Sequence, residues 1–316
     1  MDFSEKTIAI TGGSGFIGSA IIEKLRGKAK KIICISRNQK IDKEGVKVLN
    51  LDLNQIESWE IILSQAQIVL HLAGNTSIYE ASKRPQSHYK SCILPITHLI
   101  EASKKLSIIP RIVFASSATV YGLKEIQPVD ESSKAKPITI YDEHKLLVEE
   151  TLAIATKKNI ISAVSLRLAN VYGPSFSESG AKDRGILNKV AKMSIDGQNV
   201  IIYGTGEYVR DYIYIDDVVD AFIAVSNTKS NELVFNVASG VGTSVKEAFL
   251  LTINQAKNYT NMETKVSFDE WPKGISKIEK RNFIGSIELI KSECEWTPTM
   301  PFKEGINKLL EYYAKL

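Results

Sequence analysis

Residues 7–18 read TIAITGGSGFIG, a short β-branched run followed by a glycine-rich turn and the apolar start of a helix. A strand, turn and helix in this order are the context that a dinucleotide-binding fingerprint requires. Glycine permits the tight turn and close approach of the backbone, and the helix N-terminus presents free amides and a positive dipole to a pyrophosphate. The residues predicted to hold the cofactor here are Gly12, Gly15, Phe16, Ile17 and Gly18.

Short β-branched runs continue to alternate with longer amphipathic stretches through the first half of the chain. We expect strands at residues 7–11, 31–35, 46–50, 68–71, 111–115 and 162–167, and helices at 16–26, 59–65, 95–105, 141–158 and 186–195. This alternation indicates βαβ units and an α/β fold with a doubly wound parallel sheet of the Rossmann type. We place that domain at residues 1–170, with 212–240 returning to it, and a smaller mixed α/β substrate-binding lobe at 171–316.

The composition excludes several classes of protein. The net charge of +4 comes from 40 basic and 36 acidic residues scattered along the chain, which does not favour nucleic acid as a partner. Three isolated cysteines suit a reducing compartment, and no histidine or cysteine spacing indicates a metal site. The N-terminus lacks an export signal and no apolar run approaches the roughly 20 residues of a membrane span. We expect a cytoplasmic protein without membrane partners.

Tyr141 and Lys145 lie four residues apart at the start of a predicted helix, so their side chains share one face. Free tyrosine titrates near pH 10, and an adjacent ammonium favours the phenolate that could act as a base at neutral pH. Ser117 follows the strand predicted at 111–115, at the sheet edge where doubly wound folds bind ligands. The three residues predict a catalytic set in which Ser117 orients a substrate oxygen, Tyr141 exchanges its proton and Lys145 lowers the pKa of Tyr141.

These motifs, in order, resemble the extended short-chain dehydrogenase/reductase family and its nucleotide-sugar epimerase, dehydratase and reductase group. The matches run over nearly the whole chain, through LDL at 51–53, HLAG at 71–74, SSATVYG at 116–122, RLANVYGP at 167–174 and RDYIYIDD at 210–217. The resemblance implies that Asp52 and Leu53 flank the adenine, and that Leu72, Ala73 and Gly74 line the cofactor. It also implies substrate contacts from Ser117, Thr119, Asn170, Arg210 and Arg281, and a homodimer formed through the helices at 95–105 and 141–158.

Two departures from family patterns bear on the reaction and the cofactor. Ala118-Thr119 stands where hexose dehydratases carry Asp-Glu, so we reject 4,6-dehydration. Ser36-Arg37 stands where NAD sites place an acidic residue, so NADP is favoured over NAD, unless Arg37 is only a solvated charge. Cys92 replaces a usual Asn, so the sugar pocket can differ from that of relatives.

The favoured function is hydride transfer at C4 of a nucleotide-diphosphate sugar. Arg37 favours an NADPH-dependent 4-keto-sugar reductase, and the alternative is a 4-epimerase of the UDP-glucose or UDP-GlcNAc type that retains NAD. A non-enzymatic dinucleotide-binding regulator would not need the catalytic set, and a steroid or terpenoid alcohol dehydrogenase would leave Arg210 without a diphosphate partner. For Arg210 itself, the alternative is a structural ion pair with Asp211 or Asp217.

Overall fold

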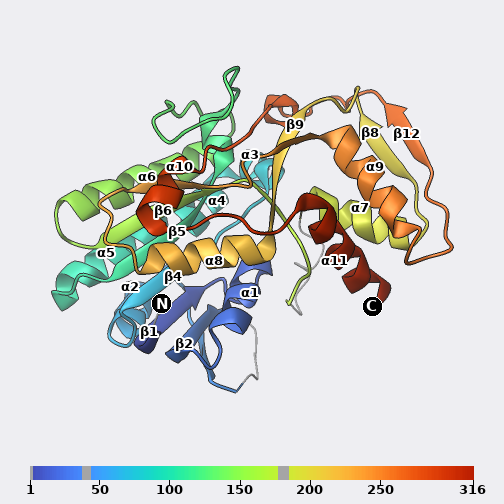
Figure 1. Cartoon of the computed structure of the whole chain (residues 1–316). Coiled ribbons are helices and arrows are strands. Elements are labelled where there is room, and N and C mark those ends of the chain that lie inside the picture. Colours follow the sequence, from blue (N-terminus) through green and yellow to red (C-terminus); the bar gives the residue numbers. More distant parts are fainter. Residues whose placement is uncertain (1–2, 38–43, 177–184) are drawn as a thin grey trace.

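Within residues 3–37, 44–176 and 185–316, the part of the chain that the computed structural model describes, seven parallel strands form one sheet (Figure 1). They are β1 (Phe3–Thr11), β2 (Ala29–Ser36), β3 (Val46–Asn50), β4 (Ile68–His71), β5 (Arg111–Ser117), β6 (Ser162–Leu168) and β10 (Val234–Val237). Their order is β10-β6-β5-β4-β1-β2-β3. The chain therefore leaves β1 toward one edge, returns, and continues from β4 toward the other, which confirms the predicted doubly wound sheet.

One face of the sheet is covered by α2 (Ile56–Leu63), α5 (Leu94–Leu106) and α6 (Ile140–Lys157). Their apolar residues recur three or four apart, and Trp59, Leu99 and Leu152 pack in one buried cluster with strand side chains. Two short helices, α3 (Ile78–Lys83) and α4 (Pro85–Cys92), lie against α6. The sequence patterns did not predict α3 or α4.

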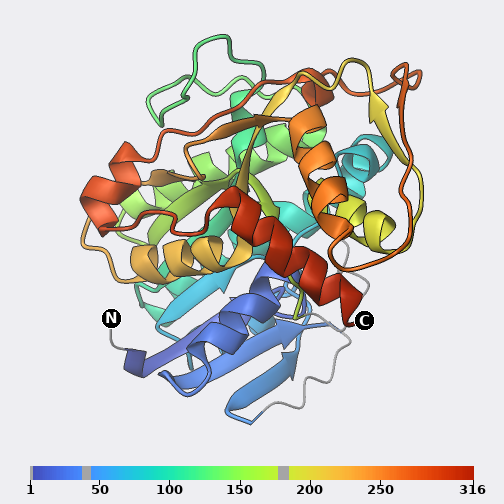
Figure 2. The same cartoon turned by 45° about the vertical axis from the view of Figure 1, so that its right-hand side comes forward.

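The opposite face carries α1 (Phe16–Leu25), α8 (Ile215–Ser226) and α10 (Glu288–Cys294). Figure 2 shows α1 and α8 side by side across this face, in agreement with their packing contacts. Because β10 pairs with β6 and α8 packs on β5 and β6, segments from the second half of the chain complete the Rossmann layer.

The remaining elements form a smaller lobe beside the carboxyl ends of the strands (Figures 1 and 2). Its sheets are β11-β9-β7 and β12-β8, covered by three helices. The bounds are β7 (Asn170–Tyr172), β8 (Val200–Tyr203), β9 (Val209–Tyr214), β11 (Gly242–Ser244), β12 (Val266–Asp269), α7 (Ile186–Ile195), α9 (Val245–Ala256) and α11 (Phe302–Ala314). The described residues also contain two 3-10 turns, η1 (Ala118–Tyr121) and η2 (Lys277–Lys280). Among the described residues, no helix has the length and apolar character needed to cross a bilayer.

Candidate active site

The glycine turn after β1 packs directly against the end of β4. Gly12 has a φ of +67°, and a Cβ there would lie 2.9 Å from the Ala73 nitrogen and 3.0 Å from the Leu72 carbonyl carbon. The Gly15 N–H donates to the Gly12 carbonyl at 2.9 Å, which closes the turn just before α1 begins at Phe16. No side chain caps α1, so its first amides remain available to an anion. A side chain at Gly12 would collide with the backbone after β4, so glycine permits this close packing, and the free amides at the start of α1 fit a bound pyrophosphate.

A buried polar contact fixes the two strand ends that border this turn. The Thr11 hydroxyl accepts from the Ala73 N–H at 3.2 Å and contacts His71 Nδ1 at 2.8 Å. Burial, aided by the positive charge of Lys145, lowers the pKa of His71 to about 3, so its ring stays neutral. Leu72 and Ala73 are thus held beside the glycine turn, and Gly74 follows them at the exposed edge.

The predicted adenosine-side residues lie at the same edge of the sheet. Ser36 ends β2, and Leu51 directly follows β3. The Leu51 N–H donates to the Ser36 carbonyl at 3.3 Å, which joins the two strand ends. Asp52 and Leu53 follow: the Asp52 carboxylate accepts from the Asn54 amide at 3.0 Å, and the Leu53 carbonyl from Trp59 at 3.0 Å. Arg37 is exposed immediately after β2.

Tyr141 and Lys145 lie on one face of α6, as predicted. A capping box between Thr139 and Asp142 starts the helix, which places Tyr141 in its first turn. The Lys145 ammonium is buried, donates to the Ala115 carbonyl at 2.6 Å and lies 5.8 Å from the centroid of the Tyr141 ring. Burial lowers the pKa of Lys145. A cation in this position favours the phenolate form of Tyr141.

Ser117 ends β5, two residues beyond the carbonyl that Lys145 holds. Its Oγ lies 2.9 Å from the Oγ1 of Thr119 and accepts from the Thr119 N–H at 3.3 Å, an arrangement that starts η1. The Ser117 side chain is therefore oriented by its own turn, and Thr119 is buried against it.

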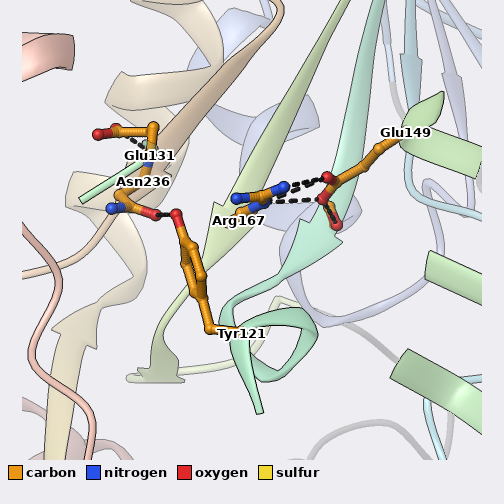
Figure 3. Close-up of polar contacts among 6 residues, drawn as sticks. Tyr121, Glu131, Glu149, Arg167 and Asn236 are labelled. Atoms are coloured by element: carbon orange, nitrogen blue, oxygen red, sulfur yellow. Dashed lines mark hydrogen bonds and ion pairs between the residues drawn. The ribbon is translucent and has the colours of Figure 1, made fainter. Parts of the chain in front are cut away.

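A buried ion pair behind these residues was not anticipated from the sequence (Figure 3). Arg167 on β6 donates to Glu149 on α6 through two nitrogens, at 2.6 to 3.2 Å, and Ser116 donates to the same carboxylate. Glu149 follows Lys145 by one turn, so the face of α6 that carries Tyr141 and Lys145 also binds the residue before Ser117. The spacing of four residues between Lys145 and Glu149 indicates that they share a helix face, but it does not reveal that Glu149 binds Arg167 on a strand.

The network continues to the far side of η1 (Figure 3). The Arg167 guanidinium lies 4.6 Å from the centroid of the Tyr121 ring, and the Tyr121 hydroxyl donates to the Asn236 side chain at 2.8 Å. The Asn236 N–H in turn donates to Glu131 at 2.7 Å. Three strands and a loop thereby hold the turn that carries Ser117.

The predicted substrate residues lie together, next to the catalytic set. Ser117 pairs in register with Leu168, and Asn170, which begins β7, pairs with Tyr212 of β9. Arg281 donates to the Asn170 side chain at 3.1 Å and to the Ile278 carbonyl at 3.1 Å. Burial lowers the pKa of Arg281, against the opposing charge of Glu279.

Arg210 on β9 is buried and bonded only to main-chain carbonyls among the described residues: those of Val209 at 3.1 Å, Glu279 at 2.6 Å and Arg281. Burial and the neighbouring Arg281 cation lower the pKa of Arg210 to about 10.

The ion pairs considered for Arg210 are not formed. Asp211 accepts from Ser239, Gly240 and Gly285, and Asp217 accepts from Thr299 and Met300. In the described part of the chain, no carboxylate forms an ion pair with either guanidinium. The arrangement presents two adjacent cations that an anionic ligand would neutralise.

Comparison with known proteins agrees with this geometry. A family model described as the NAD dependent epimerase/dehydratase family matches residues 8–238. The structure is similar to UDP-glucose 4-epimerase from Thermotoga maritima, solved with UDP-glucose (TM-score 0.86, 29% identity, 98% of this chain and 99% of that one). It also resembles UDP-N-acetylglucosamine 4-epimerase from Methanobrevibacter ruminantium, solved with UDP-N-acetylmuramic acid (0.85, 26%, 100% and 99%). A third similar structure is UDP-glucose 4-epimerase from Thermus thermophilus, solved with NAD (0.81, 26%, 97% and 98%).

Proposed function

The chain belongs to the NAD dependent epimerase/dehydratase family, and from this premise we propose that it is a UDP-sugar 4-epimerase that keeps NAD bound through the reaction. It is thus an enzyme of the extended short-chain dehydrogenase/reductase type. The relatives from T. maritima and M. ruminantium are 4-epimerases, which supports the epimerase alternative better than the reductase that Arg37 favoured. The relative from T. thermophilus was solved with NAD, which supports NAD rather than NADP as the cofactor.

The observation that carries the substrate class is the pair of adjacent guanidinium groups on the buried Arg210 and the half-buried Arg281. Neither has a carboxylate partner among the described residues, and each is oriented by main-chain carbonyls. A diphosphate supplies the missing negative charge and oxygen atoms in the planar arrangement that guanidinium groups bind. Asn170 accepts from Arg281 and lies two residues after Leu168, the register partner of Ser117, so the sugar of a bound UDP-sugar extends toward Ser117 and Tyr141.

The residues of the site divide the reaction between them. The turn at Gly12, Gly15 and Gly18 would hold NAD, which would supply reversible hydride transfer at C4 of the sugar. Tyr141, as phenolate, takes the proton from the C4 hydroxyl while the carbonyl forms, and gives it back when the hydroxyl is restored. Lys145 favours the phenolate, and Ser117 donates to the C4 oxygen. No proton or electron is consumed overall.

The decisive experiment is product analysis without added cofactor. We expect the purified protein to interconvert UDP-glucose and UDP-galactose, or their N-acetylamino counterparts, and Tyr141→Phe to lower kcat at least about 100-fold while it retains NAD. Consumption of NADPH with a 4-keto sugar, and no epimer from any UDP-sugar, would establish the reductase instead. Some relatives are UDP-glucuronic acid decarboxylases, so release of carbon dioxide from that substrate is measured in parallel.

The proposal includes the organisation of the molecule. We propose that residues 1–170, with 212–240, bind the dinucleotide, and that the smaller lobe at 171–316 binds the nucleotide sugar. We place the enzyme in the cytoplasm because its three cysteines are buried free thiols.

We also propose a homodimer formed through α5 and α6. On α6, the apolar residues Leu147 and Ile154 are exposed, which favours a partner helix, whereas Leu152 is buried in the core. Light scattering at micromolar concentration tests the dimer, and a mass of 35.0 kDa would contradict it.

A further inference from the structure

Two histidines that the mechanism above does not use form a pair beside Tyr141. His88 on α4 is buried, and its Nδ1 lies 2.7 Å from the Nδ1 of His144 on α6. The two ring planes are nearly parallel, at 19° to each other, and the centroids are 5.0 Å apart. A contact this short requires that one nitrogen donate and the other accept.

The neighbours of the pair determine which nitrogen carries the hydrogen. The Nε2 of His88 lies 3.1 Å from the Asn75 carbonyl, which can only accept, so Nε2 carries a hydrogen. In neutral His88 the Nδ1 is then an acceptor, and the Nδ1 of His144 donates to it. The pair can take up one proton and keep a single N–H···N bond. A second proton places hydrogens on both facing nitrogens and breaks the bond.

The pair joins the catalytic helix to the predicted cofactor loop. Asn75 directly follows Gly74, and the His88 ring meets the Tyr141 ring edge-on at a centroid distance of 5.8 Å. The Cys92 sulfur lies 3.7 Å from the His88 Nε2 and would lie 3.4 Å from a Cβ at Gly74. The loop after β4, helix α4 and the first turn of α6 therefore meet at this pair.

Burial, more than the neighbouring charges, lowers the pKa of both histidines. Burial and the Lys145 cation lower the pKa of His88 against the opposing effect of the Asn75 carbonyl. Burial and His88 lower the pKa of His144, against the opposing charge of Glu143. The other ionisable groups that face the pair are Tyr89 and Cys92 on α4 and Tyr141 on α6.

We propose that His88 and His144 are positioning residues: their hydrogen bond holds Tyr141 against the loop after β4, and uptake of a second proton releases it. The role of the pair in catalysis rests on the epimerase function proposed above. The bond between the two rings and its link to Tyr141 do not depend on that function, and each has its own measurement.

The activity test compares His144→Gln with wild type over pH 5 to 8.5. The Gln amide can donate to neutral His88 and, after rotation, accept from protonated His88, so the link survives acidification. Protonation of Tyr141 lowers kcat in both proteins at acid pH, so the informative quantity is the ratio of the two activities. At the acid end of this range we expect the kcat of wild type to fall at least about twofold further than that of His144→Gln, with KM moved less than about twofold. His98→Gln, a partly buried histidine on α5, is the matched control and should keep the wild-type profile. An unchanged acid limb in His144→Gln would overturn the proposal.

NMR of the wild-type holoenzyme tests the positioning role of the histidine pair independently of the proposed epimerase function. Imidazole nitrogen spectra at pH 7.5 should show hydrogen on Nε2 of His88 and Nδ1 of His144, and the Tyr141 ring signals, assigned with Tyr141→Phe, should shift with the second proton. If both histidines titrate independently near pH 6.5, or the Tyr141 signals do not move, the positioning role is wrong. Absence of epimerisation with this coupling intact would refute the proposed function alone.

Discussion

Replacing Arg210 by alanine distinguishes a substrate-binding cation from a scaffold residue. The change removes the hydrogen bonds that Arg210 donates to the carbonyls of Glu279 and Arg281, and each lost bond lowers the free energy of unfolding by about 1.5 to 3 kcal/mol. It also removes a cation whose burial beside Arg281 is unfavourable: its pKa falls from 12.5 to about 10, which corresponds to about 3 kcal/mol. These effects largely offset each other, so we expect the free energy of unfolding to fall by no more than about 3 kcal/mol.

Arg210→Ala should also weaken the binding of UDP, and no opposing effect offsets this loss of affinity. A charge-assisted contact with the diphosphate is worth about 1.5 to 3 kcal/mol, so the Kd for UDP should rise about tenfold to more than 100-fold while NAD stays bound. Calorimetric titration with UDP measures the first quantity and urea denaturation the second. Arg26→Ala is the control, because Arg26 forms an exposed ion pair with Glu23. An unchanged Kd for UDP together with a loss of more than about 3 kcal/mol in stability would refute the reasoning and assign Arg210 to the scaffold.

Three further predictions test the surroundings of the site. Arg167→Met should lower the free energy of unfolding, measured with urea, by about 3 to 5 kcal/mol, because it leaves Glu149 buried without its partner. The double variant with Glu149→Leu should lose less stability than the sum of the two single variants, and strict additivity would contradict this. The pKa of His71 falls from 6.5 to about 3 on folding, so below pH 6.5 the unfolded chain binds a proton that the folded protein excludes. The free energy of unfolding should therefore fall by about 2 kcal/mol between pH 8 and pH 5. An equal fall in His71→Gln would show that another group is responsible. Arg37→Ala should leave NAD retention unchanged and weaken only NADP binding, as measured by displacement of the bound cofactor; loss of NAD would place Arg37 elsewhere in the site.

The dinucleotide half of the protein could be predicted from local sequence. The turn at 12–18 depends on glycines and on a strand followed directly by a helix. Six of the seven described strands of the large sheet were predicted from their own apolar runs, and β10 was not. The predicted strands at 46–50 and 68–71 coincide with β3 and β4; in the smaller lobe, the predicted helix at 186–195 coincides with α7. The spacing of Tyr141 and Lys145 likewise implies a shared helix face, because helical periodicity follows from the backbone alone.

The partners of those residues were decided only by the tertiary structure. The sequence suggested Asp211 or Asp217 as partners of Arg210, whereas the fold brings the 279–281 carbonyls to it across about 70 residues of chain. The bond between Glu149 and Arg167 joins a helix to a strand, and the contact between His88 and His144 joins two helices that are 56 residues apart. Local patterns specify which face of an element is buried, but not which charged group arrives opposite it, because that depends on how separate elements pack.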